Sequence, residues 1–196
     1  MAVALAAMVI YFADGAVLAA VTLAAGVHEL GHIAALRALG YAVGGIRVEA
    51  QGLCISYSGA PNAARELAAA LAGPAAGLLL AYILSYMSAR LCSPWLSLAA
   101  GASLILSLFN LLPILPLDGG RALLLMLSLK MNAPAAEERA RRVGRALSAL
   151  IGAAGMVLAA CGGGAMLAAA CAGLFLANYA CDSITNRTPE FRGKRI

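Results

Sequence analysis

Hydrophobic residues run along most of this chain in long stretches that few charged residues interrupt. Residues 16–36, 67–89 and 95–112 are each long enough to cross the hydrocarbon layer of a membrane as a helix, which takes about 17–25 apolar residues. Two shorter stretches, 146–161 and 165–181, are joined by Gly-Gly-Gly and are predicted to form a pair of short spans. The pattern therefore predicts five membrane-spanning helices.

The remaining elements are shorter. Residues 1–12 are apolar but too short for a full span, so we predict an all-α membrane protein with five to six transmembrane helices. Residues 121–129 are predicted to form a short apolar helix, and residues 133–145 a charged, amphipathic connector at a membrane surface. We expect residues 1–196 to form a single domain.

A different pattern occupies residues 44–59, where apolar and polar side chains alternate from Ile46 to Gln51 and alternate again after Gly52. Alternation with a period of two is typical of a half-buried strand, and the glycine between the two runs is typical of a turn. We therefore predict a small membrane-associated β-hairpin or sheet at about 44–59.

Composition agrees with a membrane protein. The chain is 63% hydrophobic and only 12% charged, with a mean hydropathy of +0.89, whereas soluble domains carry about 25% charged residues. The net charge of +5 comes from basic residues in three regions that alternating spans place on one side. These residues are Arg37, Arg47, Arg65, Lys130, Arg139, Arg141, Arg142, Arg145, Arg187, Arg192, Lys194 and Arg195. Basic loops face the cytoplasm. We therefore expect a multi-pass protein of the cell membrane with a cytoplasmic C-terminus and N-terminus, surrounded by the lipid bilayer and without a nucleic-acid partner.

The five cysteines form no Cys-x-x-Cys pair, and most lie in or beside apolar segments. We interpret them as small buried apolar residues and not as disulfides or metal ligands.

The sequence "HELGH" puts both histidines of the chain, His28 and His32, inside a predicted span together with Glu29. Residues four apart on a helix lie one turn above one another, so both imidazoles can bind one ion. The pattern HExxH is typical of zinc peptidases, in which the glutamate acts as general base. Ionisable residues in a span are costly and are functional by default.

A catalytic zinc ion takes a third protein ligand. Glu49 and Glu66 are candidates, but we interpret both as charges at the membrane surface. Asp118 follows a long apolar stretch with two prolines and precedes Gly119-Gly120, so it lies at membrane depth on non-helical backbone, which is tolerated there only around a cavity or inside protein. We predict Asp118 as the third ligand; the alternative role is the N-cap of helix 121–129.

The segment before Asp118 supplies further candidates. Asn110 can donate a hydrogen bond to a substrate carbonyl or oxyanion, or it can cap free carbonyls. Pro113 and Pro116 break the helix, and the glycines permit close approach of another backbone. We name Asn110, Pro113, Pro116 and Gly119 as candidate substrate-binding or oxyanion-binding positions.

"HELGH" on a span, a hairpin, a Gly-Pro span and "NLLPILPLDGG" together resemble the site-2 protease family of intramembrane zinc metalloproteases. The residues of the second motif resemble those of the branch that includes the sporulation stage IV FB protease. The resemblance covers essentially the whole chain. It implies that His28, His32 and Asp118 bind one zinc ion, that Glu29 activates water, and that the substrate is a membrane-tethered regulator such as a pro-sigma factor, cleaved near the cytoplasmic side.

One position departs from that family. Many members carry GPxxN in the third span, whereas "GPAAG" places Gly77 at the asparagine position. We expect no PDZ or CBS domain in residues 1–196, so we expect regulation by a membrane partner or inhibitor protein, or by prior trimming of the substrate. Two alternatives remain: an inactive membrane scaffold of the same fold, and an intramembrane metal transporter.

Overall fold

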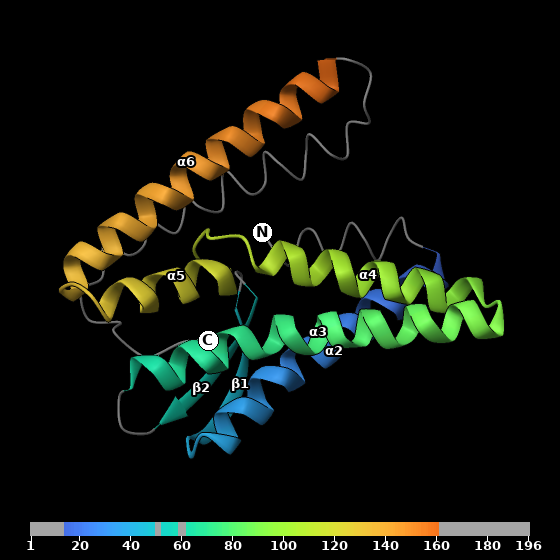
Figure 1. The fold of residues 1–196 in the computed structure, drawn as a ribbon, viewed down its shortest axis with the longest axis horizontal. Coiled ribbons are helices and arrows are strands. Elements are labelled where there is room, and N and C mark those ends of the chain that lie inside the picture. Colours follow the sequence, from blue (N-terminus) through green and yellow to red (C-terminus); the bar gives the residue numbers. More distant parts are fainter. Residues whose placement is uncertain (1–13, 50–51, 59–61, 161–196) are drawn as a thin grey trace.

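The computed structural model describes residues 14–49, 52–58 and 62–160, and these are mostly helical (Figure 1). In chain order the elements are α2 (Gly15–Ala38), β1 (Ala42–Glu49), β2 (Gly52–Ser58), α3 (Ala63–Leu91), α4 (Pro94–Asn110), α5 (Asp118–Ser128) and α6 (Ala133–Ala160). The predicted elements at 1–12 and 165–181 lie outside the described residues.

Local sequence signals set the helix boundaries. Gly40 ends α2: its φ of +83° is a left-handed conformation suited to glycine, and the amide of Tyr41 reaches back to the carbonyl of Leu36 at 3.0 Å. Asn62 begins α3, since its side chain accepts hydrogen bonds from the amides of Ala64 and Arg65, both at 3.1 Å. This cap starts the helix four residues before the apolar stretch from which we predicted it.

The helices α2, α3 and α4 pack against one another through small side chains. Two small cores lie at either end of this bundle: Leu36, Tyr41 and Ala69 at one end, and Ala20, Leu84, Ala99 and Ala100 at the other. Between them Gly31 lies so close to α3 that an added Cβ would contact the carbonyl of Ala72. Close contact through small residues is typical of helix pairs in membranes.

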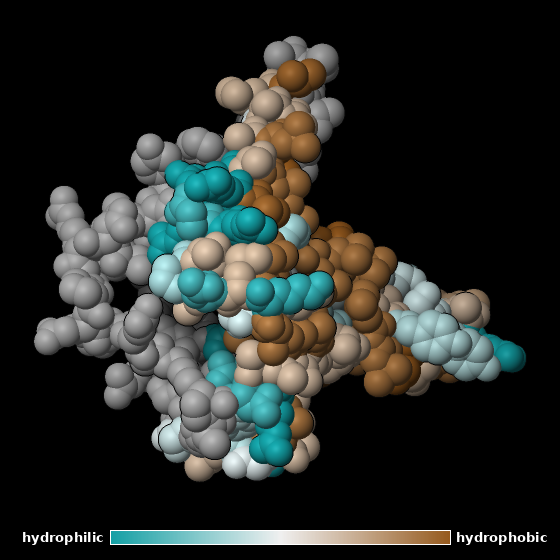
Figure 2. All heavy atoms as spheres, turned by 60° about the vertical axis from the view of Figure 1, so that its left-hand side comes forward, coloured by the Kyte–Doolittle hydropathy of each residue, from teal (hydrophilic) through white to brown (hydrophobic). Residues whose placement is uncertain are grey.

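Large apolar side chains face outward from the same helices. Leu30, Leu79 and Ile105 are 62%, 60% and 70% exposed. Figure 2 shows a band of hydrophobic atoms between one hydrophilic region and a projecting end where hydrophilic atoms return. A surface this apolar suits lipid and not water. Within the described residues, α2 and α3 are long and apolar enough to cross a membrane, and α4 is a shorter apolar helix.

The region from 133 to 160 differs from the prediction of a connector followed by a separate span. It forms one continuous helix, α6, which packs on α5. Ion pairs one turn apart support its charged half: Arg141 donates to Glu137 at 2.7 Å and Arg142 to Glu138 at 2.9 Å. The hydrogen bond from Arg142 also lowers the pKa of the exposed Glu138 carboxyl. The sequence change from charged to apolar is therefore a change of surroundings along one helix.

Two antiparallel strands occupy the region of the predicted hairpin. The register pairs Ala42 with Ser58 and Glu49 with Gly52, and an irregularity lies between Val43 and Gly45. The sheet contains only β1 and β2 among the described residues. β1 follows directly after α2, the helix that carries His28 and His32. The strands therefore lie beside the C-terminal end of that helix (Figure 1).

The segment between α4 and α5 folds tightly over the start of α5. A Cβ on Gly119 would overlap the carbonyl group of Leu111, and a Cβ on Gly120 would overlap that of Ile114. Both glycines are buried. The diglycine is therefore required for the close backbone approach that holds Asp118, the first residue of α5, against α2 and α3.

Candidate metal centre

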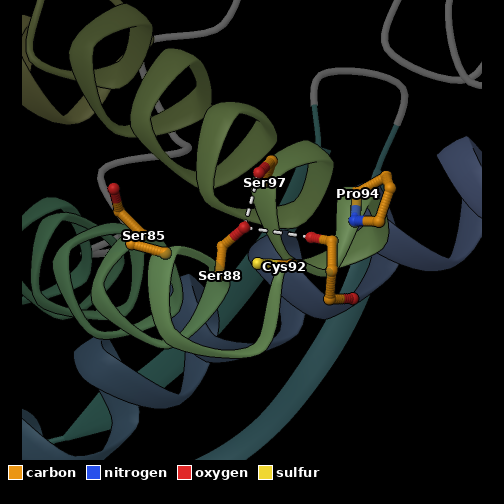
Figure 3. A pocket seen from close by; sticks show the side chains of 7 residues that line it. Ser85, Ser88, Cys92, Pro94 and Ser97 are labelled. Carbon is orange, nitrogen blue, oxygen red and sulfur yellow. Dashed lines mark hydrogen bonds between the residues drawn. The ribbon is translucent and has the colours of Figure 1, made fainter.

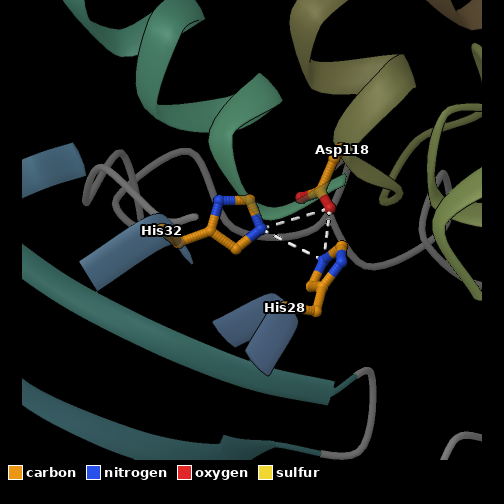
Figure 4. Close-up of side chains that lie close together, drawn as sticks. All are labelled: His28, His32 and Asp118. Carbon is orange, nitrogen blue, oxygen red and sulfur yellow. Dashed lines mark hydrogen bonds and ion pairs between the residues drawn. The ribbon is translucent and has the colours of Figure 1, made fainter. Parts of the chain in front are cut away.

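The side chains of His28, His32 and Asp118 lie close together (Figure 4). The Nε2 atoms of His28 and His32 are 3.2 Å apart, and they lie 2.9 and 3.3 Å from Oδ2 of Asp118. Both histidines are buried, and the aspartate side chain is 15% exposed. Residues separated by 86 positions in the sequence thus direct three donor atoms at one point.

These donors suit a zinc ion. Ligands about 2.0–2.1 Å from zinc at tetrahedral angles lie about 3.3 Å from one another, close to the three distances seen here. Two imidazoles and one carboxylate also match the ligand set of a catalytic zinc site, which keeps its fourth position for water or substrate. No other cluster of three metal-binding side chains occurs among the described residues.

Helix α3 contacts the ring of His32 and orients it. Nδ1 of His32 lies 2.8 Å from the carbonyl oxygen of Ala69, and because a carbonyl only accepts, Nδ1 carries the proton. The neutral ring then presents the lone pair of Nε2 to the cluster. Gly73 lies against the ring, since an added Cβ would overlap the Nε2, Cε1 and Cδ2 atoms. The sequence showed a Gly-Pro pair but gave no sign that this glycine contacts His32.

His28 and Glu29, the other two residues of the motif, lack, among the described residues, the kind of backbone hydrogen bond that orients His32. Nδ1 of His28 is buried and has no hydrogen-bond partner in the described part of the chain. Glu29 is half-buried and follows His28 directly on α2. Its carboxylate makes no hydrogen bond to any residue that the structure describes. A carboxylate in this state is available to a water molecule or a substrate group at the cluster.

Two interpretations of acidic residues need correction. Helix α5 begins at Asp118 with Leu117 as its N-cap, so Asp118 lies inside the helix and its carboxylate bonds to the histidines instead of capping. Glu66, which we interpreted as a charge at the membrane surface, is buried in the first turn of α3. The side chain of Glu49 lies outside the described residues. Asp118 is thus the acidic residue that the fold brings to the histidines.

The candidate substrate-binding positions lie around the turn before α5. Asn110 ends α4 and is half-buried, and its side chain bonds to none of the described residues. Pro113 is half-buried, Pro116 is exposed and Gly119 is buried against Leu111. The structure brings none of the four into the three-residue cluster, and their contact with substrate stays a prediction.

Gly77 gives room to helix α4. An added Cβ at this position would overlap the hydroxyl of Ser107. Ser107 donates to the carbonyl of Ser103 at 2.8 Å, and Ser103 donates to the carbonyl of Gly77 at 2.8 Å. Both serines are completely buried. A serine of α4 therefore occupies the space where a side chain at position 77 would lie, and its hydroxyl is bonded within the bundle.

This contact predicts a specific compensation. Gly77→Ala is expected to destabilise the chain by about 1–3 kcal/mol, because the new methyl group has no space beside the Ser107 hydroxyl. Adding Ser107→Ala removes that hydroxyl and should recover about 1 kcal/mol or more of the loss. Unfolding of the four proteins of this cycle in one detergent measures the coupling; additive effects would contradict the described contact.

A pocket of about 460 Å³ lies where α3 ends and α4 begins (Figure 3). Its lining residues are Ser85, Ser88, Ala89, Cys92, Ser93, Pro94 and Ser97. Ser88 donates to the carbonyl of Ser93 at 3.0 Å and bonds to the hydroxyl of Ser97. Cys92 is an exposed free thiol, not a buried residue as predicted for the cysteines. The pocket contains no charged side chain and no residue of the metal cluster.

The family model of peptidase family M50 matches residues 85–151, a part that includes Asp118 but not the two histidines. The fold is similar to the Site-2 Protease from Methanocaldococcus jannaschii, with a TM-score of 0.69, 22% sequence identity, and coverage of 91% of this chain and 84% of that one. No curated protein matches the chain. The family match covers residues 85–151 of the 196, and the similarity to the solved structure concerns the fold.

Proposed function

We propose that this chain is a zinc-dependent intramembrane metalloprotease of peptidase family M50 and that His28, His32 and Asp118 hold its zinc ion. The observation that carries this proposal is the convergence of three buried donor atoms from α2 and α5 at distances of 2.9–3.3 Å. The similarity to a solved site-2 protease supports the arrangement of the helices around them.

Each residue of the site has a role in hydrolysis. A bound zinc ion supplies Lewis-acid activation of water and of the scissile carbonyl. Glu29 accepts the proton of the attacking water and passes it to the leaving amine. The carbonyl of Ala69 holds His32 in the tautomer that binds metal. Asn110 and the backbone around Pro113, Pro116 and Gly119 line the path of the substrate.

The depth of the cluster supports cleavage near one membrane surface. Tyr86, Arg90 and Trp95 mark the α3–α4 turn, and aromatic and basic residues of this kind lie at membrane interfaces. Gly73, beside His32, lies about 26 Å from Arg90 along α3 at 1.5 Å per residue. With a hydrocarbon layer of about 30 Å, the cluster lies close to the opposite surface. That surface carries Arg37 and Arg65, so we assign it to the cytoplasm.

We propose a multi-pass protein of five to six spans with a cytoplasmic C-terminus, whose substrate is a membrane-tethered regulator. Six spans also place the N-terminus in the cytoplasm. Cleavage of the substrate releases a cytoplasmic fragment. The strands β1 and β2, beside the C-terminal end of α2, would hold an unwound substrate segment by strand addition. The resemblance to the sporulation branch suggests a pro-sigma factor as the substrate and a membrane protein as the regulator. This resemblance rests on the sequence motif "NLLPILPLDGGR".

Metal content tests the ligand set. The purified wild-type chain is expected to hold one zinc ion, and Asp118→Ala and His28→Ala should each hold far less, because two ligands do not retain catalytic zinc against a chelator. Asp14→Ala is the matched control, since Asp14 is exposed at the start of α2. Atomic absorption after dialysis against a weak chelator gives the stoichiometry. Wild type without zinc, or Asp118→Ala with full zinc, would reject the assignment.

A further inference from the structure

The outward face of helix α6 changes from basic to apolar side chains within about one and a half turns. Arg139, Arg142 and Arg145, here called the arginine face, are exposed on its first half. Leu150, Met156 and Val157 are exposed on its second half, by 67%, 70% and 62%. Among the described elements α6 packs on α5, which leaves this outward face uncovered. Figure 2 shows hydrophilic atoms gathered beside hydrophobic ones on the same side of the molecule.

The charge of the arginine face is only partly neutralised. Glu138 accepts from Arg142 at 2.9 Å and lies 3.5 Å from Arg145, while Arg139 makes no ion pair with the described residues. Three guanidinium groups and one carboxylate leave a net charge of +2. The side chains remain accessible, since that of Arg142 is 70% exposed and that of Arg145 is 50% exposed. The face therefore offers cationic donors to a ligand outside the chain.

The length of the face matches the headgroup layer of a bilayer. Arg139 and Arg145 are about 9 Å apart along the helix axis, and Leu150 follows about 7.5 Å later. Each headgroup layer is about 5–8 Å thick and is followed directly by hydrocarbon. An acidic protein segment would match the arginines, but it would leave the exposed apolar side chains that follow them without a partner. A lipid supplies both the phosphate and the acyl chain.

We propose that the arginine face of α6 is a binding surface for the headgroups of anionic phospholipids. Guanidinium groups bind phosphate oxygens through paired hydrogen bonds, and clusters of basic side chains at a membrane surface select anionic lipids. Bound lipid fixes the depth of α6 in the membrane. Because α6 packs on α5, which begins with Asp118, the lipid also supports the helix that carries a metal-cluster residue.

Native mass spectrometry of the full chain in a non-ionic detergent tests this surface. Phosphatidylglycerol and phosphatidylcholine with identical acyl chains are titrated against the wild type, which is expected to bind phosphatidylglycerol about tenfold more tightly. Replacing all three arginines by glutamine should remove the preference, whereas replacing all three by lysine should keep most of it. Arg90→Gln, at the opposite end of α3, is the matched control and should keep the preference in full.

A single substitution separates the loss of lipid binding from misfolding of the chain. Arg139→Gln breaks no ion pair among the described residues, so it should lower the preference about threefold while the unfolding temperature and the zinc content stay at wild-type values. Equal binding of the two lipids by the wild type, or a preference that survives the triple glutamine variant, would overturn the proposal. Binding of an acidic oligoglutamate peptide to this face in preference to phosphatidylglycerol would identify a protein partner instead and would also overturn it.

Discussion

Glu29→Gln is expected to lower cleavage of a tethered single-span reporter by roughly 10²–10⁴-fold, the usual contribution of a general base. The amide cannot accept the proton of the attacking water, and its shape is close to that of the carboxylate. Glu29 makes no hydrogen bond to the described residues, so the exchange breaks no contact of the fold. Measurement compares the initial rate of reporter cleavage by the variant with that of the wild type in the same membranes.

Zinc content separates this result from damage to the site. Glu29→Gln should retain the wild-type amount of zinc, because the donor atoms of the cluster come from other residues. Glu138→Gln, an exposed carboxylate on α6, is the matched control and should cleave at the wild-type rate. Full activity of Glu29→Gln would reject the general-base role, and it would leave the metal transporter or another base as the explanation for the site.

Gly73→Ala should damage the metal site from a position that binds no metal. The new methyl group would overlap the ring of His32, so the ring must turn away and lose its hydrogen bond to the carbonyl of Ala69. Loss of such a supporting contact typically costs 10–100-fold in metal affinity, and displacement of the ligand itself should exceed that range. Zinc affinity, measured by competition with a chromophoric chelator, is the readout.

Gly101→Ala provides the comparison for this result. Gly101 lies in α4 with no atom within 4 Å of an added Cβ, so alanine should leave zinc affinity unchanged and stabilise the helix by about 0.5–1 kcal/mol. A general effect of glycine replacement in these helices would appear in both variants. If Gly73→Ala bound zinc as tightly as the wild type, the contact between Gly73 and His32 would have no influence on the site.

Part of this site could be predicted because its signals are local in sequence. The spacing of His28 and His32 places both rings on one face of a helix whatever the rest of the chain does. Asp118 could be singled out because a carboxylate flanked by two prolines and two glycines has few structural uses at membrane depth. The structure brings these three residues together, and their role as zinc ligands stays a prediction.

The remaining features depend on contacts between helices, which no single stretch of sequence encodes. Gly73 and His32 meet because α2 and α3 cross at small residues, and Ser107 fills the space beside Gly77 because α4 packs against α3 one turn further along the helix. The burial of Glu66 has the same origin. The continuity of α6 is hard to predict for another reason: the change from charged to apolar residues is typical of a boundary between elements, although both halves favour a helix.

The separation of the cluster residues along the chain has a consequence for biosynthesis. Translation delivers His28 and His32 on α2 first, and Asp118 follows only after a further 86 residues have been added. A nascent chain that has reached the end of α4 therefore carries the proposed general base and two of the three proposed ligands, but not the third. Ribosome-bound intermediates of that length would lack the third proposed ligand, so the proposed hydrolytic site is complete only once the start of α5 has been added.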